Sequence, residues 1–135
     1  MEIKELTSLE EMLPQFDLMH LMYKKMTPDQ YKSFLEVMIP NNYSQVAVFE
    51  NDKCIGVTGI WFGTKLWCGK FIEIDNFIVH PEHRSKGIGD MICKFVDEKA
   101  KVWRNNNAKT KNPNVDQNSE TVEVEMTFFL FSSKL

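Results

Sequence analysis

Residues 77–89 read FIVHPEHRSKGIG, which places a glycine-bearing loop between an apolar stretch and a helical pattern. The first amide N–H groups of a helix lack partners within the helix and carry the positive end of its dipole. Gly87 and Gly89 have no side chain that would keep a ligand away from those amides. A strand, a loop of this kind and a helix N-terminus in succession predict an anion site that fits a pyrophosphate.

Two other phosphate-binding loops also carry glycines before a helix, and neither fits this sequence. The dinucleotide fingerprint G-x-G-x-x-G requires a third glycine where Ile92 stands. The P-loop pattern G-x-x-x-x-G-K-[ST] does not occur in the sequence. A purely structural interpretation stays open at this point, in which Gly87 and Gly89 serve only a tight turn from strand to helix.

Upstream of the loop, the sequence predicts a short strand followed by helices. Residues 3–6 fit the strand. Ser8 and Thr27 each stand three residues before a Glu or Gln, which is the spacing of a capping box at a helix start. Pro14 is expected to interrupt the first helix, and the second is expected to end before Pro40.

From residue 44 onward the apolar positions alternate, which predicts strands. Residues 46–48 and 55–57 flank a turn-forming segment at 50–53 and predict an antiparallel hairpin. Residues 71–79 predict a further strand that runs into the loop. Three glycines interrupt the second strand of the hairpin and are expected to have structural roles there: Gly56, Gly59 and Gly63.

Downstream of the loop, apolar residues at helical spacing predict a helix that reaches about Trp103. Residues 104–121 contain six Asn and almost no apolar residue. Burial cannot offset the entropy of ordering such a segment, so we expect a mobile loop. Residues 122–131 alternate and then become strongly apolar, which predicts a mostly buried strand.

Length and composition indicate one domain spanning residues 1–135, because 135 residues with 43% hydrophobic content are enough for a single core. The net charge of -3 and the scattered Lys and Arg residues offer no basic field for nucleic acid, which we do not expect as a partner. Cys54, Cys68 and Cys93 form no C-x-x-C pair, as expected of reduced thiols in a cytoplasmic protein. No apolar run approaches the roughly 20 residues that a membrane-spanning helix needs, so membrane insertion is not expected.

His80, Glu82 and His83 lie close enough in the sequence to raise the question of a metal site. The intervening Pro81 and the lack of further ligands nearby argue against one. We expect these three side chains to be solvated loop residues, and we expect no metal.

The segment R-S-K-G-I-G at residues 84–89 resembles motif A of the GCN5-related N-acetyltransferases, in which R-x-x-G-x-G follows a strand that ends in V-x-P. The likeness covers residues 46–102, with the hairpin, strand, loop and helix in the family's order. It implies an α/β fold with a mixed, mainly antiparallel sheet flanked by helices. It also implies acetyl-CoA as co-substrate, with its pyrophosphate on the loop and its pantetheine arm beside the preceding strand. The cofactor-binding residues that it implies are Ile78, Val79, Arg84, Ser85, Lys86, Gly87, Ile88, Gly89 and Asp90.

Members of this family transfer acetyl directly from the thioester to an amine, while a backbone N–H of the strand polarises the carbonyl. An alkyl amine with a pKa of roughly 10.4 is protonated at neutral pH, so a carboxylate must help to remove its proton. Glu73 and Asp75 alternate on the predicted strand and share a face. The resemblance favours Asp75 as this base and makes Glu73 the weaker candidate. The alternative is a carboxylate that only lines a polar cleft or pairs with Lys or Arg. The implied activity is N-acetyl transfer to a primary amine of a small molecule or a protein.

The family usually continues after the motif A helix with a strand, a helix carrying an N-x-x-A-x-x-F-Y-like run, and closing strands. This sequence lacks that run, so we expect incomplete C-terminal elements. A shortened relative, an altered chain end and completion by another copy are all compatible with this departure. An apolar strand at 122–131 would expose an edge, which makes a homodimer through that strand a hypothesis. Two alternative functions stay open: a noncatalytic acyl-CoA-binding or assembly module, and a structural remnant that binds no cofactor.

Overall fold

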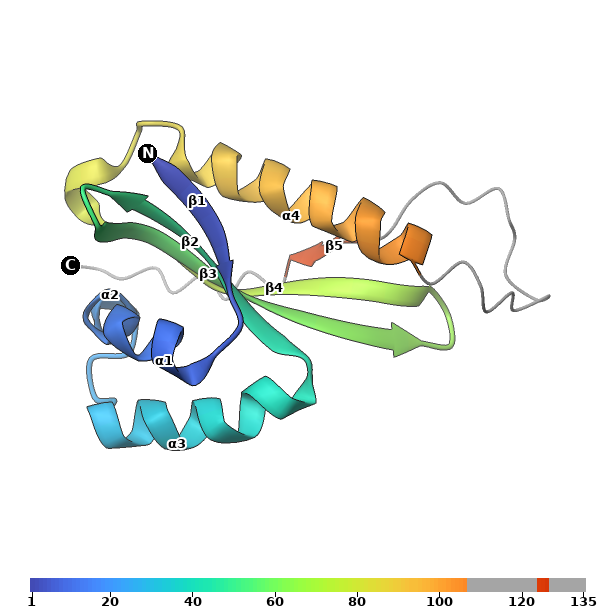
Figure 1. Cartoon of the computed structure of the whole chain (residues 1–135), viewed down its shortest axis with the longest axis horizontal. Coiled ribbons are helices and arrows are strands. Elements are labelled where there is room, and N and C mark those ends of the chain that lie inside the picture. The colour runs from blue at the N-terminus through green and yellow to red at the C-terminus, as the bar shows by residue number, and fades with distance from the viewer. Residues whose placement is uncertain (107–123, 127–135) are drawn as a thin grey trace.

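The computed structural model describes residues 1–106 and 124–126 of the chain. In these ranges a twisted sheet carries α1, α2 and α3 on one face and α4 on the other (Figure 1). The strands lie in the order β1-β2-β3-β4-β5. The strands are β1 (Glu2–Leu6), β2 (Tyr43–Glu50), β3 (Lys53–Lys65), β4 (Gly69–Val79) and β5 (Val124–Met126). The α-helices are α1 (Leu9–Met12), α2 (Phe16–Met22), α3 (Pro28–Met38) and α4 (Ile88–Asn106), and the 3-10 turns are η1 (Leu13–Gln15), η2 (Ile39–Asn41) and η3 (Pro81–His83).

The N-terminal helices begin at the two predicted capping boxes. The Ser8 Oγ accepts a hydrogen bond from the Glu11 backbone N–H at 3.2 Å. The Thr27 Oγ1 accepts one from the Gln30 N–H at 3.2 Å. Pro14 lies in η1, the turn that separates α1 from α2, so the predicted interruption is confirmed. Each box supplies acceptors for amides that the first helical turn leaves unpaired.

The sheet is mixed and mainly antiparallel, as expected. β1 with β2, β2 with β3, and β3 with β4 pair antiparallel, whereas β4 and β5 pair parallel. The predicted hairpin is β2 and β3, and its turn holds Asn51 and Asp52 at φ 51° and 62°. Both residue types tolerate this left-handed conformation, which a tight hairpin turn requires.

The glycines of β3 have the structural role that the sequence predicts. A Cβ on Gly59 would lie 2.5 Å from the Tyr43 hydroxyl oxygen. A Cβ on Gly63 would collide with the ring of Phe71. Aromatic rings on β2 and β4 therefore lie directly over the β3 backbone, and this close packing holds the three central strands together.

Two apolar cores lie on opposite faces of the sheet. The core under α4 contains that helix's buried stripe of Ile88, Ile92, Val96 and Ala100, spaced one turn apart. The sheet side of this core consists of Val46, Val48, Ile55, Ile60, Ile72 and Ile74. The core under α1, α2 and α3 is formed by Leu6, Met12, Leu18, Met19, Tyr31, Leu35, Tyr43, Ala47, Val57 and Ile78.

The structure differs from the sequence prediction at the end of α4. The helix continues to Asn106, so residues 104–106 are helical although we expected a mobile loop there. No Gly or Pro stands in these three positions, and nothing local ends the helix. The rest of the predicted loop, residues 107–121, lies outside the described residues. Of the predicted strand at 122–131, β5 covers 124–126 and the remainder lies outside them. No helix in the described part of the chain is long and apolar enough to cross a membrane.

Candidate active site

The loop between η3 and α4 presents its backbone to solvent. Ser85 and Gly87 have φ of 65° and 78°, in the left-handed region, on either side of Lys86. Turns that contain such positive-φ residues can point successive N–H groups toward one side and so make a concave site for an anion. Helical bonding starts with the Met91 N–H, which donates to the Gly87 carbonyl at 3.0 Å. The three amides between these residues, at 88–90, therefore lack intrahelical acceptors and can point at an anion.

Gly87 and Gly89 differ in what they contribute to this loop. An added Cβ on Gly87 would meet no atom within 4 Å, and only the positive φ makes glycine the favoured residue there. An added Cβ on Gly89 would lie 3.7 Å from the Phe77 ring, which is an ordinary contact. Of the two glycines, only Gly87 therefore has the positive φ that a tight turn can require of glycine. The space beside Gly87 is open, as an anion site needs.

The loop is tied to the β2–β3 hairpin by the residues around η3. The His80 backbone N–H donates to the Ile55 carbonyl at 2.8 Å. The His83 Nε2 lies 3.2 Å from the Glu50 Oε2, with the His83 side chain 16% exposed. The prediction that His83 is a solvated loop residue is therefore wrong, because its ring packs down to reach Glu50. Within the described ranges no three metal-binding side chains form a cluster.

The strand that precedes the loop has a partly open edge. β5 pairs with β4 only at Ile72, Glu73 and Ile74. Of the five residues that follow on β4, Asp75, Ile78 and Val79 pair with β3, and none of the five pairs with another described strand on the opposite side. Ile78 is buried against the α1–α3 core and Val79 packs against the α4 core. Their side chains are thus anchored, and no strand among the described residues covers this edge of the main chain, where an extended ligand could pair.

A β-bulge lies in the middle of this edge. Val57 pairs with Ile78 and Gly59 with Asp75, so Thr58 faces two residues of β4, at 76 and 77. The extra residue is Asn76, which has a left-handed φ of 56°. The Thr58 Oγ1 donates a hydrogen bond to the Asp75 carbonyl at 3.0 Å. A bulge bends its strand and takes main-chain groups out of the regular ladder, here at residues 76 and 77, which have no partner on β3.

Polar side chains gather around the bulge on the α1–α3 face. Glu73 and Asp75 share this face, because Ile72 and Ile74 between them pack against the opposite core. The Asp75 Oδ2 accepts a hydrogen bond from the indole N–H of Trp61 at 3.4 Å. This bond orients one of the two predicted carboxylates.

The hydroxyl of Tyr23, at the end of α2, donates to the Asn76 Oδ1. Burial raises the pKa of Tyr23, and the nearby negative charge of Asp75 adds to the rise. The phenol therefore stays protonated and acts as a donor at neutral pH. Tyr23, Asp75 and Asn76 together form a polar group that joins the helical face to the open edge of β4.

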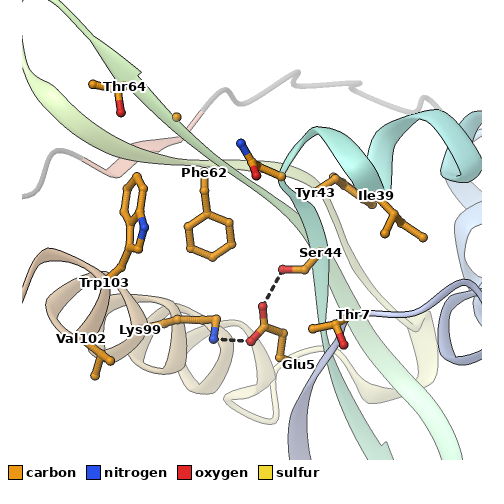
Figure 2. Close-up of a pocket in the computed structure, with 12 residues that line it drawn as sticks. Glu5, Thr7, Ile39, Tyr43, Ser44, Phe62, Thr64, Lys99, Val102 and Trp103 are labelled. Carbon is orange, nitrogen blue, oxygen red and sulfur yellow. Dashed lines mark hydrogen bonds and ion pairs between the residues drawn. The ribbon is translucent and has the colours of Figure 1, made fainter. Parts of the chain in front are cut away.

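A separate pocket of about 670 Å³ lies at the other end of α4. Figure 2 shows the Glu5 carboxylate there between the Lys99 ammonium and the Ser44 hydroxyl, which donates to it at 2.7 Å. Phe62 and Trp103 form an aromatic wall, with ring centroids 5.3 Å apart. None of the predicted cofactor-binding or catalytic residues lines this pocket.

Sequence reasoning did not assign roles to Tyr23, Trp61 and Asn76. The sequence did contain a signal for the bulge at Asn76. Along β4, the residues that face α4 change from even-numbered to odd-numbered positions. Ile72 and Ile74 occupy even positions, whereas Phe77 and Val79, which join the same core, occupy odd ones. One extra residue between them is the signature of a bulge. Tyr23 and Trp61 reach the site only through tertiary packing, and no sequence spacing reveals that.

Comparison with known proteins agrees with the geometry. The family model described as the acetyltransferase (GNAT) family matches residues 6–117. No match is found among curated proteins. A GNAT family acetyltransferase structure from Staphylococcus aureus has 18% identity and a TM-score of 0.64, with 76% of this chain and 81% of that chain covered.

Other solved structures show the same fold. Ribosomal-protein-alanine N-acetyltransferase from Brucella melitensis has 18% identity and a TM-score of 0.65 over 76% of this chain and 73% of that chain. Glucosamine-6-phosphate N-acetyltransferase from Arabidopsis thaliana has 16% identity and a TM-score of 0.59 over 76% and 77%. At such identities the structural likeness establishes the fold, and it confirms the α/β class expected from the sequence. Because the family model spans most of its length, the chain belongs to the GNAT acetyltransferase family.

Proposed function

We propose that this chain transfers an acetyl group from acetyl-CoA to a primary amine by direct attack on the thioester. The observation that carries the proposal is the pair of left-handed residues, Ser85 and Gly87, that opens onto the N-terminus of α4. Backbone amides in this arrangement suit the two phosphates of a pyrophosphate. Arg84 and Lys86 are exposed on the same loop and would add positive charge. The amides of Ile88, Gly89 and Asp90 would complete the cradle.

The open edge of β4 supports a place for the rest of acetyl-CoA. In our proposal the pantetheine arm lies along Ile78 and Val79 and pairs with their main chain as an added strand would. This edge leads directly from the loop to the bulge at Asn76. An amide that the bulge takes out of the ladder would then donate to the thioester carbonyl as negative charge develops on it.

Asp75 is the proposed general base. As the amine nitrogen forms its bond to the acyl carbon, the bond from that carbon to sulfur breaks. Before the attack, Asp75 takes one proton from the ammonium, directly or through water, and so gives the nitrogen its lone pair. The second proton that the nitrogen loses passes to solvent, and the departing thiolate takes a proton from solvent. Trp61 holds one oxygen of Asp75 and leaves the other available. Glu73 lies two residues earlier on the same face and remains the weaker candidate.

Titration calorimetry with acetyl-CoA, with NAD as negative control, tests the cofactor site. Release of free thiol in the presence of a panel of small amines and amine-bearing peptides tests the transfer. Saturable binding of acetyl-CoA with amine-dependent thiol release would support the proposal. Binding without turnover would favour a noncatalytic acyl-CoA-binding module, and no binding would overturn both readings.

We also propose that the protein acts in the cytoplasm as one domain and forms a homodimer through residues 122–131. The solution mass measured by light scattering tests the dimer. A monomeric mass at all concentrations would reject it.

A further inference from the structure

One hydrogen bond connects the helical face of the molecule to the bulge in β4. The Tyr23 hydroxyl donates to the Asn76 Oδ1 across 53 positions of sequence. Tyr23 is the residue at which α2 ends, and its backbone there is no longer helical, with φ -109° and ψ 74°. Its side chain is half-buried, so the phenol lies between the helix and the strand.

Asn76 has a backbone conformation that needs support from its surroundings. Its φ of 56° is left-handed, which costs free energy for any residue that has a side chain, although Asn tolerates it better than most. Such conformations persist where neighbouring groups determine them. Thr58 holds the carbonyl just before Asn76, and Tyr23 holds its side chain.

A second tyrosine also lies close to this amide. Burial raises the pKa of Tyr43 well above its usual range, and hydrogen bonds from Gln45 and Asn76 act against that rise. The Tyr43 ring packs on Gly59, the β3 residue that pairs with Asp75, and on Trp61 at a centroid distance of 4.8 Å. The Tyr23 hydroxyl from α2 therefore holds the Asn76 side chain, while the Tyr43 ring from β2 packs on the β3 backbone beside the bulge.

We propose that Tyr23 is a positioning residue for acyl transfer, which holds Asn76 left-handed and thereby fixes the direction of the bulge amides that meet the acyl carbonyl. This inference rests on the proposed function. Tyr23 acts through Asn76 and not on the reacting atoms, because its hydroxyl proton is already donated to the Asn76 Oδ1. Loss of the hydroxyl would let the bulge sample other conformations while the cofactor loop stays intact.

Tyr23→Phe removes the hydroxyl and keeps the ring. We expect a fall in kcat of about tenfold or more, with the Kd for acetyl-CoA within about twofold of the original, since the lost hydroxyl bonds to Asn76 and not to the loop at 84–87. Tyr31→Phe is the matched control. It also deletes one tyrosine hydroxyl, which donates to the Met12 carbonyl at 3.0 Å and accepts from the Gln45 Nε2 at 3.1 Å, and which makes neither bond to the bulge.

Asn76→Gly separates positioning from direct chemistry. Glycine adopts a positive φ without a tether, so Tyr23→Phe should have little further effect on kcat in the Asn76→Gly background. An equal loss in both backgrounds would overturn the inference, because it would mean that Tyr23 acts on the substrates directly.

Amide hydrogen exchange gives a readout that does not depend on turnover. We expect Tyr23→Phe, and not Tyr31→Phe, to speed exchange by about tenfold at Val57 and Ile78, the pair of residues beside the bulge. Unchanged exchange at these residues would overturn the inference even if kcat fell. If the unaltered protein binds acetyl-CoA but shows no amine-dependent thiol release, the proposed function fails, and the exchange result still decides whether Tyr23 holds the bulge.

Discussion

Replacing Gly87 with alanine is expected to destabilise the folded protein by about 1 kcal/mol. A residue with a Cβ loses roughly 1–2 kcal/mol in a left-handed conformation, and Gly87 has φ 78°. Alanine also restricts the unfolded chain, which offsets part of this loss. Steric contact adds nothing, because an added Cβ would meet no atom within 4 Å. The backbone angle is thus the only structural cause of the expected loss.

Gly89→Ala is the matched control for this substitution. Gly89 lies in the first turn of α4, and a Cβ there would make only an ordinary contact with Phe77 at 3.7 Å. Alanine in a helix is favoured over glycine by roughly 0.5–1 kcal/mol. The two variants should therefore differ by about 2 kcal/mol, although each adds one methyl group to the same loop. For a chain of 135 residues this is a difference in Tm of about 6–12 °C.

Thermal and urea unfolding of the ligand-free protein measure this difference. Equal stability of Gly87→Ala and Gly89→Ala would refute the left-handed conformation of Gly87, and with it the concave anion site. Acetyl-CoA titration of the same variants is a second readout. Gly87→Ala should weaken binding by about tenfold or more, because its methyl group points into the space assigned to the pyrophosphate.

Asp75→Asn is expected to lower amine-dependent turnover by about 100-fold with acetyl-CoA affinity preserved, and an unchanged rate across a pH series would reject Asp75 as the base. Burial raises the pKa of the Cys54 thiol from 9.0 to about 11, so at pH 8 its alkylation by iodoacetamide should be roughly 100-fold slower in the folded protein than in urea. Equal rates, followed by mass spectrometry, would contradict that burial. The same shift favours the neutral thiol in the folded state, so Cys54 should contribute a fall in stability as the pH rises from about 9 to 11. Deleting Asn76 should leave Tm within about 5 °C of that of the original protein and abolish turnover. A much larger fall in Tm would show that the bulge is needed for packing instead.

The sequence predicted the helix starts and the order of the elements well, because those features depend on local chemistry. Ser8 and Thr27 could be recognised as caps since each bond joins residues only three apart. The end of α4 was harder to place, because no Gly or Pro marks it and the helix runs past Trp103 to Asn106. Helix ends without a specific cap depend on packing, which one sequence does not reveal.

The candidate site has two parts, the loop at residues 84–89 and the polar residues around Asp75. They also differ in how much of each the sequence indicates. The proposed cofactor loop has a sequence signal because its chemistry is contained in consecutive residues, from Arg84 to Gly89. The structure adds that only one of its two glycines needs a positive φ. The proposed acceptor half combines Tyr23 from α2, Trp61 from β3 and Asp75 from β4. Contacts among three elements arise from the tertiary fold, and only Asp75 carried a sequence signal through its alternation with Glu73.

The bulge at Asn76 is not required for packing of the core, but the proposed acyl-transfer site depends on it. With Asn76 removed, Phe77 and Val79 would continue the alternation of Ile72 and Ile74 without a break, and the same residues would face the α4 core. Regular pairing with β3 would then be restored at Thr58. Packing therefore does not require the extra residue, and its left-handed φ makes it an unfavourable choice for a plain strand. Residues depart from their local conformational preference mainly at functional sites. Here, regular pairing would keep a backbone amide from donating to a ligand. The bulge lies on the edge of β4 that leads to the cofactor loop, and that position is where an acyl carbonyl would need an unpaired amide.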